Sequence, residues 1–257
     1  MKVIPVMDKN GQLVKIINFS FYYSHLPIDV FIMAGGEGIR LRPLTENIPK
    51  PLLKVGDKPI LEHLIDRLVH FGVTNFQISI NYLGDKISDY FKNGADKNIS
   101  IQYIIEDQKM GTAGSISKAE SFKNDHVMII NSDLLTNVNF EDFYLDFLEK
   151  DADMSIASVP YTVNMPYAIL DVDGAKVNGL KEKPTYNYIG NAGIYLIKKK
   201  HLARIPKNSY YNATDLIEDL IKDKLNVSFY TILDYWLDIG KIDDFHKAQR
   251  DIQHIKF

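Results

Sequence analysis

The sequence contains no cysteine, which excludes disulfide bonds, thiol catalysis and cysteine-based zinc sites. Its seven histidines are dispersed and show no ligand spacing, so a histidine zinc site is not expected either. No apolar run approaches the roughly 20 residues that a membrane-spanning helix needs. The N-terminus lacks the apolar core of a signal peptide, because charged and turn residues interrupt it by Asp8. These absences favour a soluble cytoplasmic protein with no membrane partner.

A strong excess of charge is also lacking. The formal net charge is −3, so no dominant basic surface is expected and nucleic acid is not an expected partner. The fifteen glycines and ten prolines are scattered, which excludes a low-complexity or collagen-like chain. The length of 257 residues fits one large α/β domain with a small appendage.

The appendage is at the N-terminus, where two short β-rich runs at 3–6 and 13–17 flank a turn that contains Gly11. This predicts a β-hairpin. An isolated hairpin is marginal in water, so we expect it to pack on the main domain, on a partner chain or on a missing part of its own domain. The string IPVMDKNGQLVKII resembles the closing strands of a CBS domain. The resemblance implies that residues 1–28 are the end of a CBS region lying upstream, and that residues 29–257 form the main domain.

The main domain alternates predicted strands and helices. Short apolar runs predict buried strands at 30–33, 76–80, 101–105 and 127–130. Helical periodicity and stop signals predict helices at 60–71, 85–91, 112–122, 214–224 and 242–252. This alternation predicts an α/β fold with a mainly parallel sheet and helices on both faces. After residue 150, alternating strands at 154–159, 167–172 and 188–197 predict a smaller β extension that carries substrate contacts.

A glycine-rich string, AGGEGIRLRPLTENIPKPLL, occupies residues 34–53 directly after the first predicted strand. Gly35, Gly36 and Gly38 allow the backbone to approach a ligand and expose N–H groups to phosphate oxygens. The string is not a Walker A loop, which would end in GK[ST]. It is not a dinucleotide fingerprint either, because Leu41 stands where the third glycine should be.

Two cations flank the proline-containing part of the same string. Arg40 and Lys50 bring fixed positive charge to the glycine loop from either side. Glycines alone would indicate an ordinary turn with solvated cations nearby. The complete string favours a binding site for phosphate groups instead.

This string resembles the signature of the sugar nucleotidyltransferase family, GGxGTRLxPLT followed by PKP, and the likeness continues through most of residues 29–250. The resemblance implies a Rossmann-like α/β domain with an added sugar-binding sheet. It also implies a magnesium-dependent enzyme that joins a nucleoside triphosphate to a sugar 1-phosphate and releases pyrophosphate. Arg40 and Lys50 would be the catalytic residues, and the loop from Ala34 would bind the nucleotide. Ile39 departs from the family pattern, which has threonine there.

The family resemblance implies two magnesium ligands. Asp133 follows the apolar strand at 127–130, where it would face the crevice at the carboxyl ends of the strands. Asp238 lies in the string YWLDIG. Two carboxylates together with phosphate oxygens and water suit Mg²⁺, which prefers oxygen ligands in octahedral geometry.

Sugar contacts are also implied by resemblance. Glu182 and Lys183, followed by proline, match an EKP element in which the glutamate accepts hydrogen bonds from sugar hydroxyls and the lysine contacts the sugar phosphate. Asn191 matches a residue of the next strand that points at the sugar. Ala168 stands where the family often has glycine, which puts transfer of a relative's sugar to this chain in doubt.

The choice of base is predicted from Glu106, which precedes Gly111 and Thr112 in the string EDQKMGTAG. Relatives that use dTTP or UTP tend to carry glutamine at this position. Guanine offers two adjacent N–H donors, which a carboxylate can accept together. The string therefore favours GTP, with Gly111 admitting the base close to the backbone, although the register can also be drawn with Asp107 or Gln108.

The whole pattern most resembles CBS-linked glucosamine-1-phosphate guanylyltransferases of legionaminic acid routes, with mannose-1-phosphate guanylyltransferases as near neighbours. We therefore expect transfer from GTP to a glucosamine or N-acetylglucosamine 1-phosphate, with a homo-oligomeric enzyme. Three alternatives stay open: a mannose-1-phosphate guanylyltransferase, a relative using UTP, dTTP or CTP, and a non-catalytic homologue that binds nucleotide sugars and regulates a partner. The string from Asp171 to Asp173 has the spacing of a glycosyltransferase metal motif, but the following glycine favours a hairpin turn.

Overall fold

The computed structural model describes residues 3–18 and 25–255. A seven-stranded sheet forms its centre, with strands in the order β14-β10-β13-β8-β3-β6-β7. All neighbouring strands are parallel except β13, which is antiparallel to both β8 and β10. The strands are β3 (Ile28–Ala34), β6 (Asn75–Ile80), β7 (Ser100–Ile105), β8 (His126–Asn131), β10 (Met154–Asn164), β13 (Thr185–Lys198) and β14 (Val227–Thr231). The predicted α/β fold with a mainly parallel sheet is confirmed.

Helices cover both faces of the sheet because successive side chains of its strands point to opposite sides. Along β3, Val30 and Ile32 join a core with helices α1, α2 and α3, whereas Phe31 joins a second core with α4. A third cluster lies under the glycine-rich segment and includes Leu41 and Ala248 of α5. The helices are α1 (Ile60–His70), α2 (Gly84–Phe91), α3 (Phe140–Glu149), α4 (Ala213–Lys222) and α5 (Ile242–Asp251).

Four of the five predicted helices are present, but the prediction of a helix at 112–122 is wrong. The chain there forms only a short 3₁₀ helix, Gly114–Lys118. The N–H groups of Ala113 and Gly114 both donate to the carbonyl of Tyr211, so they serve a tertiary contact. Helix α3 was not predicted from the sequence. Its N-cap is Asn139, whose side chain accepts hydrogen bonds from two backbone N–H groups of the first turn.

Two small antiparallel strand pairs lie outside the central sheet. β15 (Trp236–Asp238) pairs with β9 (Leu134–Thr136), which follows β8 directly. β4 (Lys54–Val55) pairs with β5 (Lys58–Pro59) ahead of α1. In the described part of the chain, no helix is long and apolar enough to cross a membrane.

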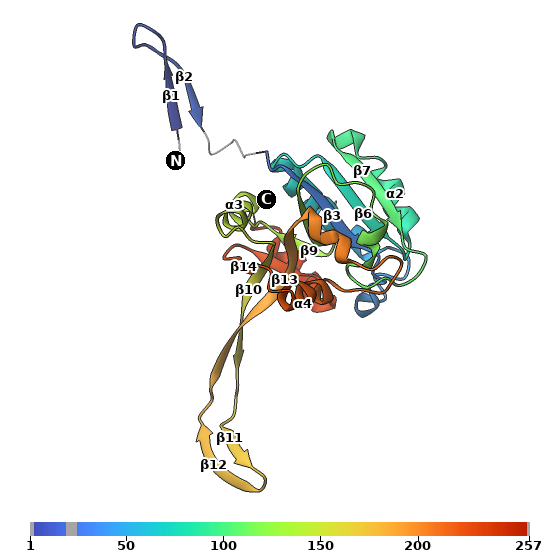
Figure 1. Ribbon diagram of the computed structural model, residues 1–257, viewed down its shortest axis with the longest axis vertical. Helices are drawn as coiled ribbons and strands as arrows, with labels where there is room; N and C mark the ends of the chain where they lie inside the picture. The colour runs from blue at the N-terminus through green and yellow to red at the C-terminus, as the bar shows by residue number, and fades with distance from the viewer. Residues whose placement is uncertain (1–2, 19–24, 256–257) are drawn as a thin grey trace.

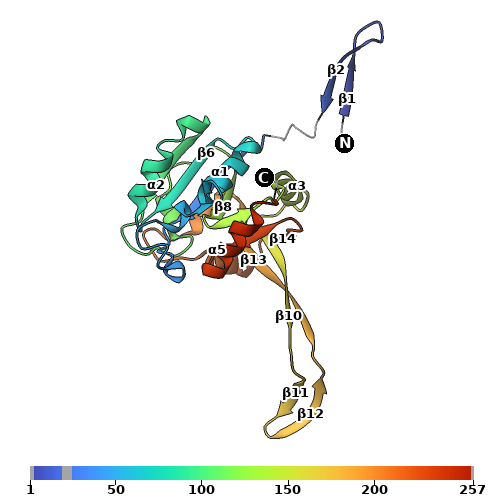
Figure 2. The same cartoon turned by 180° about the vertical axis from the view of Figure 1, so that it is seen from behind.

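A long antiparallel arm extends from the sheet. Beyond their paired inner halves, β10 and β13 continue together outward, and the chain between them forms a second ribbon of β11 (Ile169–Asp173) and β12 (Lys176–Lys181). Figures 1 and 2 both show β11 and β12 at the far end of this arm, away from the helices. The turn between β11 and β12 contains Gly174 at φ +57°, which confirms the predicted hairpin turn after Asp173.

The N-terminal hairpin is confirmed as β1 (Val3–Met7) and β2 (Leu13–Asn18). Gly11 has a φ of +74°, and the Asp8 carboxylate accepts hydrogen bonds from the N–H groups of Asn10 and Gln12. The assignment of residues 1–28 to the end of a CBS domain stays a prediction.

Candidate active site

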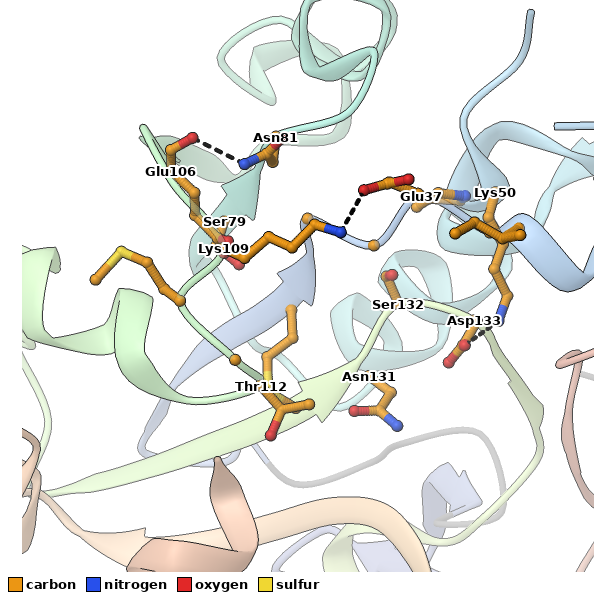
Figure 3. A pocket seen from close by; sticks show the side chains of 18 of the residues that line it. Glu37, Lys50, Ser79, Asn81, Glu106, Lys109, Thr112, Asn131, Ser132 and Asp133 are labelled. Atoms are coloured by element: carbon orange, nitrogen blue, oxygen red, sulfur yellow. Dashed lines mark hydrogen bonds and ion pairs between the residues drawn. The ribbon is translucent and has the colours of Figure 1, made fainter. Parts of the chain in front are cut away.

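A pocket of about 700 Å³ opens at the carboxyl ends of the parallel strands β3, β6, β7 and β8. This is the edge at which open α/β sheets bind ligands. The pocket collects side chains and backbone from several loops (Figure 3). Of the residues predicted from the sequence, it is lined by Gly35, Gly36, Gly38, Arg40, Lys50, Glu106, Gly111, Thr112 and Asp133. Ala34 is buried at the end of β3, directly beside them.

The glycine loop is fixed by its own backbone conformation. Gly38 has a φ of +63°, and a Cβ atom there would lie 3.0 Å from the side chain of Thr45. The Thr45 hydroxyl donates a 2.8 Å hydrogen bond to the Gly38 carbonyl, and Thr45 is completely buried. A Cβ on Gly36 would meet nothing within 4 Å, so this part of the loop is open to a ligand. The loop therefore has the exposed backbone that phosphate groups bind.

Both predicted cations reach the pocket from short 3₁₀ turns. Arg40 lies in Ile39–Leu41 and Lys50 begins Lys50–Leu52. Lys50 forms an ion pair and hydrogen bond with Asp133, and the Lys50 side chain is only 12% exposed. The Arg40 guanidinium lies close to the backbone of Gly240, where an added Cβ would stand 3.4 Å from it. The pocket thus holds two positive charges at one end.

Asp133 and Asp238 are brought together by the pairing of β9 with β15. Asp238 is opposite Leu134, and the N–H of Ile239 donates to the Asp133 carbonyl at 3.1 Å. The pKa of Asp238 is raised to about 6. Burial is the largest cause, and the nearby negative charge of Asp133 raises this pKa further. Lys50 and Arg40 act in the opposite direction.

This carboxylate pair fits a magnesium ion. Within residues 3–18 and 25–255, the Oδ1 atoms of both Asp133 and Asp238 are buried and have no hydrogen-bond partner. The described residues contain no group of three or more His, Cys, Asp or Glu side chains arranged for a metal. Mg²⁺ is commonly held by only one or two carboxylates, with substrate phosphates and water as its other ligands. Asp133 lines the pocket and Asp238, next to it, does not, but their two unpartnered carboxylate oxygens meet that requirement.

Glu106 forms the opposite wall of the pocket, immediately after β7. The residue is 9% exposed, and its carboxylate lies against the backbone of Gly35, where an added Cβ would be 3.0 Å away. Burial is the main cause that raises the pKa of this carboxyl, while polar contacts with the Ser79 hydroxyl and the Met110 N–H lower it. The Asn81 side chain donates a 2.9 Å hydrogen bond to the Glu106 carbonyl, which fixes the backbone at this point.

Gly111 and Thr112 join the pocket to the start of α4. Gly111 has a φ of +73°, and a Cβ there would lie 2.6 Å from the Tyr211 carbonyl oxygen. The Thr112 hydroxyl accepts a 2.8 Å hydrogen bond from the N–H of Ala213, the first residue of α4. The tight contact of Gly111 is therefore with the protein's own backbone.

The structure does not place the three predicted sugar contacts in the pocket. Glu182 and Lys183 are exposed on the arm, between β12 and β13, and Lys183 has a φ of +40°. The Asn191 side chain accepts a 2.9 Å hydrogen bond from the N–H of Gly193 in β13. None of the three lines the pocket.

The pocket also contains polar residues that were not predicted from the sequence. Glu37 of the glycine loop and Lys109 form a 2.8 Å ion pair (Figure 3), and the hydrogen bond from Lys109 lowers the pKa of Glu37. Ser79 and Asn81 lie at the end of β6. Asn81 follows an apolar strand just as Asp133 follows another, so the same signal would have found it.

Comparisons with known proteins agree with this geometry. A model of the family described as "Nucleotidyl transferase" matches residues 29–255. The bifunctional protein GlmU of Methanocaldococcus jannaschii is 32% identical over 230 residues, which are 87% of this chain and 54% of that protein. The D-glycero-α-D-manno-heptose 1-phosphate guanylyltransferase of Aneurinibacillus thermoaerophilus is 31% identical over 88% of this chain and 99% of its own length. The chain thus spans about half of the first relative and nearly all of the second.

A solved structure shares the fold. HddC from Yersinia pseudotuberculosis, complexed with GMP-PN, is 29% identical and superimposes with a TM-score of 0.68. The match covers 88% of this chain and 99% of HddC.

Proposed function

The chain belongs to the nucleotidyl transferase family and is an enzyme of the sugar-1-phosphate nucleotidyltransferase type, and we propose that it transfers GMP from GTP to a hexose 1-phosphate of the glucosamine or N-acetylglucosamine type. The observation that carries the proposed chemistry is that Arg40, Lys50 and Asp133 line one pocket, with Asp238 next to Asp133 and an unpartnered oxygen on each aspartate. Such a site can hold a triphosphate and balance the charge that develops on it.

The proposed reaction is an in-line displacement at the α-phosphorus. A phosphate oxygen of the sugar 1-phosphate forms a new bond to this phosphorus, and the bond from the phosphorus to the leaving pyrophosphate breaks. The nucleophile is already an anion near neutral pH, so no general base is needed. The protein has to bring two polyanions together and stabilise the charge that shifts to the leaving group.

The residues of the pocket divide this work. Lys50, held by Asp133, would neutralise the α-phosphate, and Arg40 would neutralise the departing pyrophosphate. The glycine loop would donate backbone N–H groups to the phosphate oxygens. A magnesium ion on Asp133 and Asp238 would, when bound, supply further positive charge at the reacting phosphate.

The choice of GTP rests on Glu106. A buried carboxylate in the pocket wall can accept both the N1–H and the N2–H of guanine, a pairing that uracil and thymine cannot offer. A guanylyltransferase among the relatives, and the GMP-PN complex of HddC, support this choice. Glu182 and Asn191 remain the proposed contacts of the sugar, and Lys183 remains the proposed contact of its phosphate. Since Glu182 and Lys183 lie on the arm, the proposal requires that the arm approach the pocket described above during the reaction.

The experiment that tests the proposal is pyrophosphate release with Mg²⁺, using the five common nucleoside triphosphates against glucosamine, N-acetylglucosamine, mannose, glucose and heptose 1-phosphates. Selective turnover of GTP with a glucosamine-type phosphate is the expected result. Turnover with UTP or dTTP would refute the role of Glu106 and keep the enzyme class. Nucleotide binding without turnover across the panel would support the regulatory alternative.

A further inference from the structure

A lysine side chain reaches across the proposed nucleotide pocket. Lys109 comes from the loop after Glu106, and its ammonium forms a 2.8 Å ion pair with the carboxylate of Glu37 in the glycine loop. Figure 3 shows the Lys109 side chain extending to Glu37. Their hydrogen bond lowers the pKa of Glu37 and raises that of Lys109, so both groups are charged near neutral pH. The pair therefore joins the wall proposed for the base with the loop proposed for the phosphates.

Exposure to solvent distinguishes this ion pair from the other one in the pocket. The Lys50 side chain, which is paired with Asp133, is only 12% exposed, whereas the Lys109 side chain is 79% exposed. An ion pair in contact with water contributes little to stability, because water and salt screen it. Exposed side chains also change rotamer rapidly. Lys109 can therefore leave Glu37 at little cost, and a contribution to stability does not explain the pair.

The charges that line the pocket favour such a mobile cation. Among the described residues of the lining, three cationic side chains are balanced by three acidic ones: Arg40, Lys50 and Lys109, and Glu37, Glu106 and Asp133. A nucleoside triphosphate adds several negative charges to this neutral set. Lys50 and Lys109 are both paired with carboxylates, but only Lys109 is exposed enough to turn towards a new partner.

Glu37 lies where it would oppose a bound phosphate. It stands between Gly36 and Gly38, whose backbone N–H groups are proposed to donate to phosphate oxygens. A Cβ atom on Gly36 would meet nothing within 4 Å, so the loop is open at this point. A phosphate held by the loop would come close to the Glu37 carboxylate, which repels it, and to the paired ammonium, which attracts it.

We infer that Lys109 is a further phosphate-binding residue, which Glu37 holds in the absence of a nucleotide and which turns to the phosphates when a nucleotide binds. Glu37 then competes with the nucleotide for Lys109 and lowers the affinity of the pocket for the nucleotide. This inference rests on the proposed position of the phosphates at the glycine loop, but not on the choice of base or on the transfer reaction.

Two substitutions with opposite expected effects test the inference. Isothermal titration calorimetry of the complete chain measures the Kd of GTP with Mg²⁺, without a sugar phosphate, at about 50 mM salt. Two opposite unit charges in contact attract each other in water strongly enough to change a binding constant about fivefold. Lys109→Gln should therefore raise the Kd about fivefold, and Glu37→Gln should lower it about threefold. Both differences should shrink at about 0.5 M salt.

Two simpler probes show which part of the nucleotide Lys109 contacts. Inorganic tripolyphosphate carries the charges without the base, and guanosine carries the base without the charges. Both substitutions should shift the Kd of tripolyphosphate in the same directions as that of GTP, and leave the Kd of guanosine within about twofold. These results would assign the contact of Lys109 to the phosphates.

The matched control is Lys92→Gln. It removes another exposed lysine that has an acidic partner, Asp96, and it lies outside the lining of the pocket. It should change none of the three dissociation constants by more than about twofold. Far-UV circular dichroism and the unfolding temperature check that all the variants are folded.

Two results would overturn the inference. If Lys109→Gln leaves the Kd of tripolyphosphate unchanged, Lys109 does not bind phosphate. If Glu37→Gln weakens the binding of GTP, Glu37 supports the nucleotide site and does not compete for the lysine. Failure of the proposed reaction would look different: the variants would shift tripolyphosphate binding as expected, while GTP would bind without turnover. That outcome would support the role of Lys109 and refute the proposed transfer.

Discussion

Replacement of Glu106 by glutamine is the sharpest test of how the pocket reads the base. The change keeps the size and burial of the side chain but replaces one acceptor oxygen by an N–H donor. Against guanine, that donor would face another donor. A hydrogen bond to a charged group contributes about 1.5–3 kcal/mol, so kcat/KM for GTP should fall by about 10- to 100-fold. Turnover of UTP or dTTP should change by much less, or improve.

The assay is pyrophosphate release under kcat/KM conditions for each nucleotide, with a fixed sugar 1-phosphate. Asp107→Asn is the matched control, because this neighbouring carboxylate is exposed and bonded to Lys118. It also separates two of the three possible registers of the motif: if Asp107 reads the base, Asp107→Asn and not Glu106→Gln will lose turnover of GTP. A Glu106→Gln enzyme whose GTP efficiency stays within about twofold would refute the reasoning.

The same carboxyl predicts a pH dependence. Burial raises the pKa of Glu106, so it takes up a proton at a higher pH than an exposed glutamate does. The protonated form accepts guanine's donors less well. Wild-type efficiency with GTP should therefore decline as the pH falls through this raised pKa, relative to its efficiency with UTP. The Glu106→Gln variant should lose this difference between the nucleotides.

Three further predictions concern the metal pair, the stability of the fold and the arm. Asp133→Asn should lower kcat at least about a hundredfold and weaken its dependence on Mg²⁺. The control Asp234→Asn changes an exposed aspartate and should do neither. An unchanged kcat in Asp133→Asn would contradict the proposed magnesium site. Burial tends to raise the pKa of Asp153, but the hydrogen bond from His201 and other polar contacts outweigh it and lower the pKa to about 2. The ionised Asp153 therefore stabilises the folded protein above pH 4, and this contribution is lost as the pH falls towards 2. Asp153→Asn should lower the free energy of unfolding by about 2 kcal/mol at pH 7 and by almost nothing at pH 2, as measured by urea denaturation. Lys183→Ala should raise the KM for the sugar phosphate about tenfold with little change in the KM for GTP, and equal effects on both would argue against its role.

Much of the fold was predictable because apolar runs and helical periodicity are local signals. The strands β3, β6, β7 and β8 each follow from a short apolar run, and α1 ends near Gly72 as predicted. Helix α3 also carries a local signal, since Phe140, Phe143, Tyr144 and Phe147 are buried at helical spacing. The absence of a helix at 112–122 was not predictable, because it depends on a contact with Tyr211 far along the chain.

The pocket was predictable in part for a similar reason. The glycine loop and Asp133 come from adjacent parallel strands, whose carboxyl ends meet at one edge of the sheet. Asp238 reaches the same place through the pairing of β15 with β9, and no spacing in the sequence shows this. The ion pair of Glu37 with Lys109 likewise joins two loops that only the fold brings together. The arm itself was not predicted. Alternating apolar and polar residues indicate a strand with two different faces, but they do not show whether the rest of the protein covers either face.

Asp133 connects the two halves of the proposed chemistry. One of its carboxylate oxygens accepts from Lys50, and the other is buried without a partner among the described residues. Asp238 also has a buried carboxylate oxygen without a hydrogen-bond donor, and each such oxygen lowers the stability of the fold. A cation between the two aspartates would relieve both without displacing Lys50. Asp133 would then help to hold the cation as well as Lys50, and both would supply positive charge for the α-phosphate. The loss of Asp133 should therefore be more damaging than the loss of Asp238, because it removes both the metal ligand and the group that positions the lysine.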